Sequence, residues 1–212
     1  MDGKAYEISQ TIGRIYNVTD LVTELVRDTL FFESSGGGVT LSGGEPLMQC
    51  DFLAELLPIL KRHGIHVTLD TCGFATEKDF QRIVNLVDLV LFDVKHLDDE
   101  RHKALTGVSN RLILRNLIWL RQSGTVYCLR YPVVPSYNDD EMNLLMMEQL
   151  LVDHQGRAEA LHLIPFHGLA HAKYQRMGIP WKMHGGIVVD ESQLSVLQKR
   201  FSSFGIPVII GG

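Results

Sequence analysis

Short apolar runs alternate with longer amphipathic stretches along this chain, and this alternation constrains the fold more than any other feature. The runs are rich in Val, Ile, Leu and Thr, and the stretches between them have apolar residues at helical spacing. We expect strands at 39–41, 65–71, 88–95, 125–135, 160–165 and 206–210. Strands that alternate with helices predict βαβ units and an α/β fold with a parallel, right-handed sheet.

The stretches between the strands predict the helices and the extent of the domain. We expect helices at about 18–31, 51–63, 77–86, 99–105, 110–123, 139–152 and 191–204. Residues 1–16 lack a clear period and are interpreted as the tail of an upstream segment. Residues 17–212 are interpreted as one domain.

Charge and hydropathy exclude several classes of function. The chain has 20 Lys and Arg against 25 Asp and Glu, a net charge of −5, so a nucleic-acid backbone is not an expected partner. No apolar run approaches the ~18–20 residues that span a bilayer, and the first residues do not resemble a signal peptide. We therefore expect a cytoplasmic protein without a membrane partner.

A glycine-rich loop follows the first expected strand. Residues 36–38 and 43–44 are glycines on either side of Val39-Thr40-Leu41, and Glu45-Pro46 ends the loop. Because glycine leaves main-chain groups uncovered, this loop is a candidate ligand cradle at the carboxyl end of a strand. A tight turn without a ligand is the alternative.

Polar residues gather at the carboxyl ends of the expected strands, where a barrel or part-barrel has its mouth. They are Asp70, Asp93, Lys95, Arg130 and His167. Their common position favours a functional site.

Each of these residues has a chemical and a structural interpretation. Asp70 and Asp93 could act as acid and base, could neutralise Lys95, or could hold a cation together with the Thr71 hydroxyl and the Leu91 carbonyl. Alternatively, the two aspartates could cap the next helices. Lys95 shares a face with Asp93 and could bind a ligand carboxylate. Arg130, inside an apolar strand, needs a partner or an open cavity. A single histidine such as His167 is more often a structural group than a catalyst.

Cysteine spacing gives no sign of a metal centre. Cys50, Cys72 and Cys128 lie far apart and are three in number, which suits neither a cluster nor a disulfide framework. We expect each to be a small buried apolar residue.

Five ordered blocks resemble those of a known family. They are Ser42-Gly43-Gly44-Glu45-Pro46, Leu69-Asp70-Thr71-Cys72-Gly73, Leu91-Phe92-Asp93-Val94-Lys95, Arg130-Tyr131-Pro132-Val133-Val134-Pro135 and Leu163-Ile164-Pro165-Phe166-His167. In this order they resemble the glycyl-radical enzyme activating enzymes of the radical S-adenosylmethionine (SAM) superfamily, to which pyruvate formate-lyase activating enzyme belongs. The resemblance runs from about Asn17 to Gly212.

The resemblance implies a partial (β/α) TIM-like barrel that binds SAM against a four-iron four-sulfur (4Fe-4S) cluster. An electron from the cluster cleaves SAM, and the 5′-deoxyadenosyl radical takes a hydrogen from a glycine of a partner glycyl-radical enzyme. A reduced flavodoxin or ferredoxin is the implied electron donor.

The same resemblance implies roles for particular residues. Main-chain oxygens of Gly43, Gly44 and Glu45 would hold the methionyl amino group. The other implied roles are contacts of Asp93, Val94 and Lys95 with the methionine part, His167 on the adenosyl side, a monovalent cation at Asp70, Thr71, Leu91 and Asp93, and Arg130 facing the partner's glycine loop.

The chain departs from the family pattern at its beginning. It has no CxxxCxxC loop, and the first barrel strand and the cysteine-rich insert of many relatives are also missing. We therefore expect the sequence as given to bind no cluster and to be inactive alone, with an unpaired edge on strand 39–41. Two alternatives stay open: a cluster-free scaffold for a glycyl-radical enzyme, and an unrelated barrel enzyme that binds a phosphate.

Overall fold

A parallel six-stranded sheet forms the centre of the molecule, as the alternating sequence pattern predicts. The computed structural model describes residues 13–168, 174–175, 178, 180, 187 and 189–211. The strands are β1 (Gly38–Leu41), β2 (His66–Thr71), β3 (Leu89–Asp93), β4 (Val126–Val133), β5 (Leu161–Pro165) and β6 (Val208–Ile210). Their order in the sheet is their order in the chain, and every neighbouring pair is parallel. β1 and β6 lie at opposite edges, so the described sheet is an open, partial barrel.

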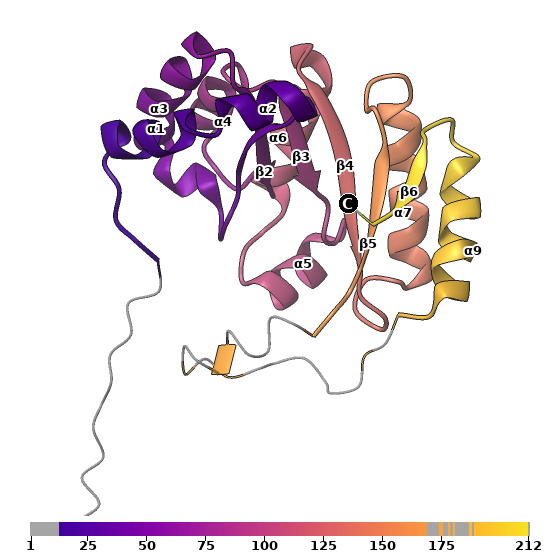
Figure 1. Ribbon diagram of the computed structural model, residues 1–212. Coiled ribbons are helices and arrows are strands. Elements are labelled where there is room, and N and C mark those ends of the chain that lie inside the picture. The colour runs from indigo at the N-terminus through magenta and orange to yellow at the C-terminus, as the bar shows by residue number, and fades with distance from the viewer. Residues whose placement is uncertain are drawn as a thin grey trace, which may run out of the picture.

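Two helices precede the first strand and the others connect the strands (Figure 1), and five of the described α-helices begin at a side-chain cap. Side-chain oxygens of Asn17, Thr76, Asp98, Asp140 and Asp190 each accept a hydrogen bond from a first-turn N–H. The helices are α1 (Val18–Val26), α2 (Thr29–Ser35), the 3₁₀ helix η1 (Pro46–Gln49), α3 (Cys50–Arg62), α4 (Glu77–Val84), α5 (Asp99–Thr106), α6 (Arg111–Ser123), α7 (Glu141–His154) and α9 (Glu191–Ser202). None of the described helices is long and apolar enough to cross a membrane.

The single helix predicted for 18–31 is wrong, because the structure has two helices there. The N–H groups of Arg27 and Asp28 bond to the carbonyls of Glu24 and Leu25 at 3.2 and 3.1 Å, three residues back, which tightens and ends α1. The second helix then runs to Gly36, whose φ of +66° ends it.

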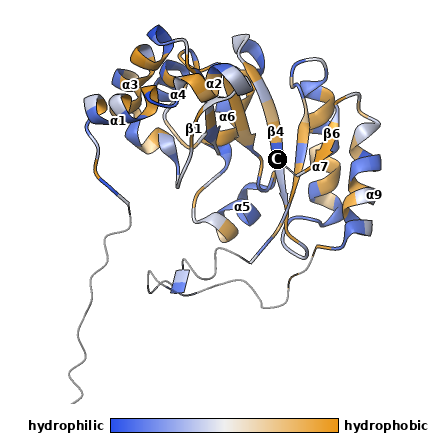
Figure 2. Cartoon of the chain, in the orientation of Figure 1, coloured by the Kyte–Doolittle hydropathy of each residue, from blue (hydrophilic) through white to orange (hydrophobic). Residues whose placement is uncertain are grey.

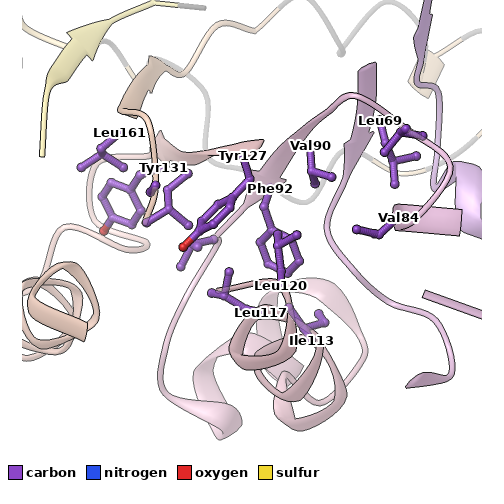
Figure 3. Packing of buried hydrophobic residues seen from close by; sticks show 14 of the residues in the cluster. Leu69, Val84, Val90, Phe92, Ile113, Leu117, Leu120, Tyr127, Tyr131 and Leu161 are labelled. Carbon is purple, nitrogen blue, oxygen red and sulfur yellow. The ribbon is translucent and has the colours of Figure 1, made fainter. Parts of the chain in front are cut away.

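The hydrophobic core lies between one face of the sheet and the helices. Figure 3 shows Ile113, Leu117 and Leu120 of α6 pointing toward Phe92 and Tyr127 of the sheet. Figure 2 shows the same division, with orange along the strands and blue on outward turns of α9.

The two faces of the sheet differ, since one packs on the core and the other carries polar groups on β2, β3 and β4. Along β3, Val90 and Phe92 are fully buried, whereas Leu89, Leu91 and Asp93 are partly exposed. β3 is therefore fully buried on one face of the sheet only. The exposed set of side chains on β2, β3 and β4 includes Asp70, Asp93 and Arg130.

Parts of the predicted organisation lie outside the described residues. Residues 1–12 of the predicted tail belong to that part, and the boundary at residue 17 stays a prediction. The described residues before α1 are tied to it, since the Tyr16 hydroxyl donates to the Glu24 carboxylate at 2.8 Å.

Candidate functional site

A polar cavity lies at the carboxyl ends of the first four strands. Its volume is about 240 Å³. Its lining comes from the loop after β1, from the ends of β2 and β3, and from the middle of β4. The lining residues are Ser42, Gly43, Gly44, Asp70, Thr71, Cys72, Asp93, Lys95 and Arg130. Seven of the residues singled out from the sequence as binding groups therefore share one space: Gly43, Gly44, Asp70, Thr71, Asp93, Lys95 and Arg130.

The glycine loop contributes uncovered main chain to this cavity. Gly43 has φ = +129°, which side chains other than glycine rarely adopt. A Cβ built at Gly43 or Gly44 would meet no atom within 4 Å, so close packing is not the reason for glycine here. The loop needs glycine for its conformation, and open space adjoins it.

The carboxylate of Glu45 is occupied by the protein itself. Its Oε1 accepts hydrogen bonds from the Thr71 hydroxyl at 2.6 Å and the Leu47 N–H at 3.1 Å. Its Oε2 accepts from the N–H and the thiol of Cys72, both at 2.9 Å. Glu45 therefore ties the loop after β1 to the end of β2, which leaves its main chain to act on a ligand.

Arg130 lies between two aspartates. Its Nη1 is 2.8 Å from Asp70 Oδ1, and its Nε is 3.3 Å from Asp93 Oδ1. The strand register explains this arrangement, because Arg130 is the direct partner of Asp93 on the next strand. The guanidinium thus has both the carboxylate partners and the open cavity that the sequence indicated it would need.

The Asp93 carboxylate is poorly satisfied in this arrangement. Its Oδ1 and the Arg130 Nε are buried, and neither has a hydrogen-bond partner of good geometry among the described residues. Burial raises the pKa of Asp93, and the positive charges of Arg130 and Lys95 partly oppose that rise. A further cationic or hydrogen-bonding group in the cavity would stabilise the ionised form.

Lys95 lies two residues beyond the end of β3 and borders two cavities. Besides the polar cavity, its side chain lines a mostly apolar cavity of about 410 Å³. The other residues lining the apolar cavity are Ala104, Leu105, Thr106, Pro132, Val134, Tyr137 and Asn138. A ligand with one charged and one apolar part would match this pair of spaces.

The remaining predicted site residues lie outside the lining of the polar cavity. Val94 is buried in the core, and its N–H donates to the Arg130 carbonyl at 2.8 Å. Leu91 lies on β3 in register with Asp70. His167 is exposed just after β5. Their predicted roles stay predictions.

Two lining residues had no assigned role in the sequence. The Ser42 hydroxyl donates to Asp70 at 2.9 Å. Cys72 is half-buried, and burial together with the Glu45 carboxylate raises the pKa of its thiol to about 11. The expectation that each cysteine is simply a buried apolar residue is correct for Cys128 and wrong for Cys72 and Cys50, which are only partly buried. One indication in the sequence pointed to Ser42 and Cys72 as part of the site: both lie within the five blocks that resemble the activating enzymes.

The described residues do not fit an iron–sulfur cluster. Within them, no group of three His, Cys, Asp or Glu side chains could hold a metal ion. The three cysteines lie on α3, after β2 and on β4. We therefore assign no step of a reaction to a cluster held by these residues.

Comparisons with known proteins agree with this geometry. The model of the radical SAM superfamily matches residues 8–147. Over 207 residues, the chain is 35% identical to the trans-4-hydroxy-L-proline dehydratase activating enzyme of Clostridioides difficile, covering 96% of this chain and 68% of that enzyme. Over 175 residues it is 36% identical to the pyruvate formate-lyase 1-activating enzyme of Escherichia coli K12, covering 82% and 71%.

A solved structure gives the same result. A domain of a pyruvate-formate lyase-activating enzyme from Bacteroides vulgatus matches with a TM-score of 0.69 and 28% identity, over 83% of this chain and 99% of that one. The chain spans about two thirds of the length of the curated relatives it matches.

Proposed function

Because the chain belongs to the radical SAM superfamily and, within it, to the glycyl-radical enzyme activating enzymes, we propose that its polar cavity binds the methionine part of SAM. One observation carries this proposal. Uncovered main chain at Gly43 and Gly44, the Asp93 carboxylate and the Lys95 ammonium line a single space. These groups complement an α-amino and an α-carboxylate group.

Each end of an amino acid has a matching group in the cavity. The ammonium of SAM would bind main-chain oxygens of residues 43–45, since the Glu45 carboxylate is already bonded to β2. The carboxylate of SAM would pair with the Lys95 ammonium. The positive charge of SAM would stabilise the ionised carboxylate of Asp93. The main chain of Val94 would lie beside the methionine part.

The adenosyl part needs space beyond the polar cavity. A volume of about 240 Å³ lies below the ~300–1,000 Å³ of sites for larger ligands, so the polar cavity suits the methionine part alone. The apolar cavity that shares Lys95 supports an extended pose, and His167 is proposed to contact the adenosyl side.

Bound SAM would supply radical chemistry: one electron from the donor would break its C5′–S bond to give methionine and a 5′-deoxyadenosyl radical, which would take a hydrogen atom from a glycine of a partner glycyl-radical enzyme and leave as 5′-deoxyadenosine. We propose a partner like pyruvate formate-lyase, with Arg130 facing its glycine loop, and a reduced flavodoxin or ferredoxin as electron donor. Since residues 1–212 contain no CxxxCxxC motif, this chain alone is proposed to bind SAM weakly and not to cleave it.

A monovalent cation is a further part of the proposal. Asp70, Thr71, the Leu91 carbonyl and Asp93 offer oxygens, but Arg130 forms ion pairs with both carboxylates in this structure. A bound K⁺ or Na⁺ would therefore displace the guanidinium, which would then be free to turn toward the partner. Replacement of K⁺ by a bulky organic cation should weaken SAM binding, and Asp70→Asn should abolish that salt effect.

Calorimetry of the 212-residue chain with SAM tests the central proposal. Lys95→Ala should weaken SAM binding about 10- to 100-fold, the effect of losing a charge-assisted hydrogen bond worth ~1.5–3 kcal/mol. Lys103→Ala is the control, because Lys103 is exposed on α5 and lines neither cavity. Equal affinity in wild type and Lys95→Ala, or selective binding of sugar phosphates, would overturn the assignment.

A further inference from the structure

Three buried asparagines bind the main chain that carries Lys95. We call Asn110, Asn138 and Asn143 the asparagine clamp; their side chains are between 1 and 3% exposed. They contact residues 95–97, the segment that follows β3. Asn138 Nδ2 donates to the carbonyl of residue 95 at 3.0 Å. Asn110 Nδ2 donates to the carbonyls of residues 96 and 97 at 3.1 and 2.8 Å, and Asn143 Oδ1 accepts from the N–H of residue 97 at 2.9 Å.

Asn138 is the member of the clamp that reaches Lys95 directly. It joins the segment after β3 to β4, because its second Nδ2 hydrogen bond goes to the carbonyl of Pro132 on β4 at 2.6 Å. Its Oδ1 accepts from the Val134 N–H at 2.9 Å. Both Nδ2 protons and the side-chain oxygen are therefore used, and all three partners are main-chain groups.

Asn138 is itself held from the core. Its main-chain carbonyl accepts hydrogen bonds from the Tyr131 hydroxyl and, at 2.8 Å, from Asn143 Nδ2. Asn143 lies in the first turn of α7, and Tyr131 is a fully buried residue of β4. The main chain of Lys95 is thus linked to β4 and α7 through buried polar groups that form hydrogen bonds with one another.

A side-chain clamp is needed here because the regular sheet ends before Lys95. The last residue of β3 is Asp93, and among the described residues the last main-chain hydrogen bond between this segment and β4 runs from the Val94 N–H to the Arg130 carbonyl. Beyond this point no strand ladder fixes the chain, and the Lys95 side chain is exposed. We propose that Asn138 is a positioning residue: by holding the Lys95 carbonyl against β4, it fixes the Lys95 ammonium over the polar cavity for the carboxylate of SAM. This inference rests on the proposed function, because it concerns how Lys95 meets its ligand.

A double-mutant cycle on SAM affinity tests this role. Asn138→Ala should weaken SAM binding to the 212-residue chain about tenfold, within the range of coupling between contacting residues. In a Lys95→Ala background the same substitution should have no further effect, because the group that it positions is already missing. A uniform loss in both backgrounds, or no loss in either, would overturn the inference.

Matched variants separate positioning from loss of stability. Asn116→Ala is the control: Asn116 is fully buried and donates to the carbonyls of Gly73 and Ala75 at 2.8 and 2.9 Å, in a different loop. It should lower the unfolding midpoint as much as Asn138→Ala does while keeping the wild-type affinity. A loss of affinity in Asn116→Ala equal to that in Asn138→Ala would contradict a specific role.

A second variant keeps the test valid if Asn138→Ala does not fold. Asn138→Ser retains a small polar group that can donate to one of the two carbonyls, and it should restore part of the affinity. Amide exchange of residues 95–97 should be faster in both Asn138 variants and unchanged in Asn116→Ala. If Lys95→Ala binds SAM as wild type does, the proposed function itself fails; if only the Asn138 effects are missing, the failure is confined to this inference.

Discussion

Ser136 has a backbone conformation that is unfavourable for serine. Among the described residues it is the one non-glycine residue with positive φ, at +67°, and it lies in the loop between β4 and α7. Its N–H donates to Asp139 Oδ1 at 2.6 Å, which holds the turn. The same loop is also held by hydrogen bonds of the Asn138 side chain with Val134 and Pro132.

Glycine at position 136 should stabilise the protein. Ser136→Gly removes a left-handed-conformation penalty of ~1 kcal/mol or more, which the added freedom of the unfolded chain partly offsets, so we expect a gain of up to about 1 kcal/mol. The midpoint of urea unfolding measures the change. Ser136→Ala is the control and should give no gain; a lower midpoint for Ser136→Gly would contradict the expectation.

His154 is a buried neutral histidine at the other end of β4 from the cavity. Its Nδ1 is 2.7 Å from the Tyr127 hydroxyl, and its side chain lies in the core between β4 and α7. Burial, with a smaller effect of Arg121, lowers the pKa of His154 from 6.5 to about 4.

This lowered pKa predicts a loss of stability in mild acid. Between pH 6.5 and 4 the unfolded chain binds a proton at His154 and the folded chain does not, so the free energy of unfolding falls as the pH falls. At ~1.4 kcal/mol per pH unit, we expect a loss of about 3 kcal/mol by pH 4. Denaturant unfolding at several pH values measures it. His154→Gln should lack this contribution, and equal slopes in both proteins would refute it.

Glu45 joins three elements through one carboxylate. The groups that it bonds belong to η1, to the end of β2 and to the loop after β2. The β1–β2 ladder ends at the pair Leu41 and Leu69, so it does not hold the loop that follows β1. The Glu45 carboxylate connects that loop to the end of β2.

Removal of this carboxylate should weaken the first half of the sheet. Glu45→Ala leaves the Leu47 and Cys72 N–H groups and the Thr71 hydroxyl without their acceptor, and we expect a destabilisation of about 2–3 kcal/mol. Glu45→Gln retains one acceptor oxygen and should lose less. Thermal unfolding distinguishes them, and equal stability of wild type and Glu45→Ala would contradict a structural role.

β1 forms an open edge of the described sheet. It pairs with β2 on one side only, and Leu30 and Phe31 of the neighbouring α2 are 77 and 71% exposed. An unpaired parallel edge beside apolar side chains favours association between copies of the chain.

The 212-residue chain should therefore self-associate as its concentration rises. Thr40→Lys places a charge on the edge strand and should shift the mean mass in sedimentation experiments toward the monomer. A lysine at Thr125, just before the interior strand β4, is the control and should not change the mass. A wild-type chain that stays monomeric at high concentration would contradict this prediction.

The strand and helix positions could be predicted from the sequence because each element has its own local pattern. The split between α1 and α2 could not, since the tight turn at Arg27 and Asp28 leaves the apolar spacing unbroken. The contact of Arg130 with both aspartates depends on strand register, which no local pattern encodes. Asn138 and Lys95 are 43 residues apart in the sequence. The hydrogen bond between the Asn138 amide and the Lys95 carbonyl could not be predicted, because neither segment has a sequence pattern that indicates it.

The strand order has a consequence for synthesis of the chain. Because every strand pairs with the one made just before it, each new βα unit can dock onto structure that has already left the ribosome. The residues that line the polar cavity lie between positions 42 and 130, so its walls are complete before β5 and β6 are translated. This polar cavity can thus assemble co-translationally, while the residues after position 130 are still being made.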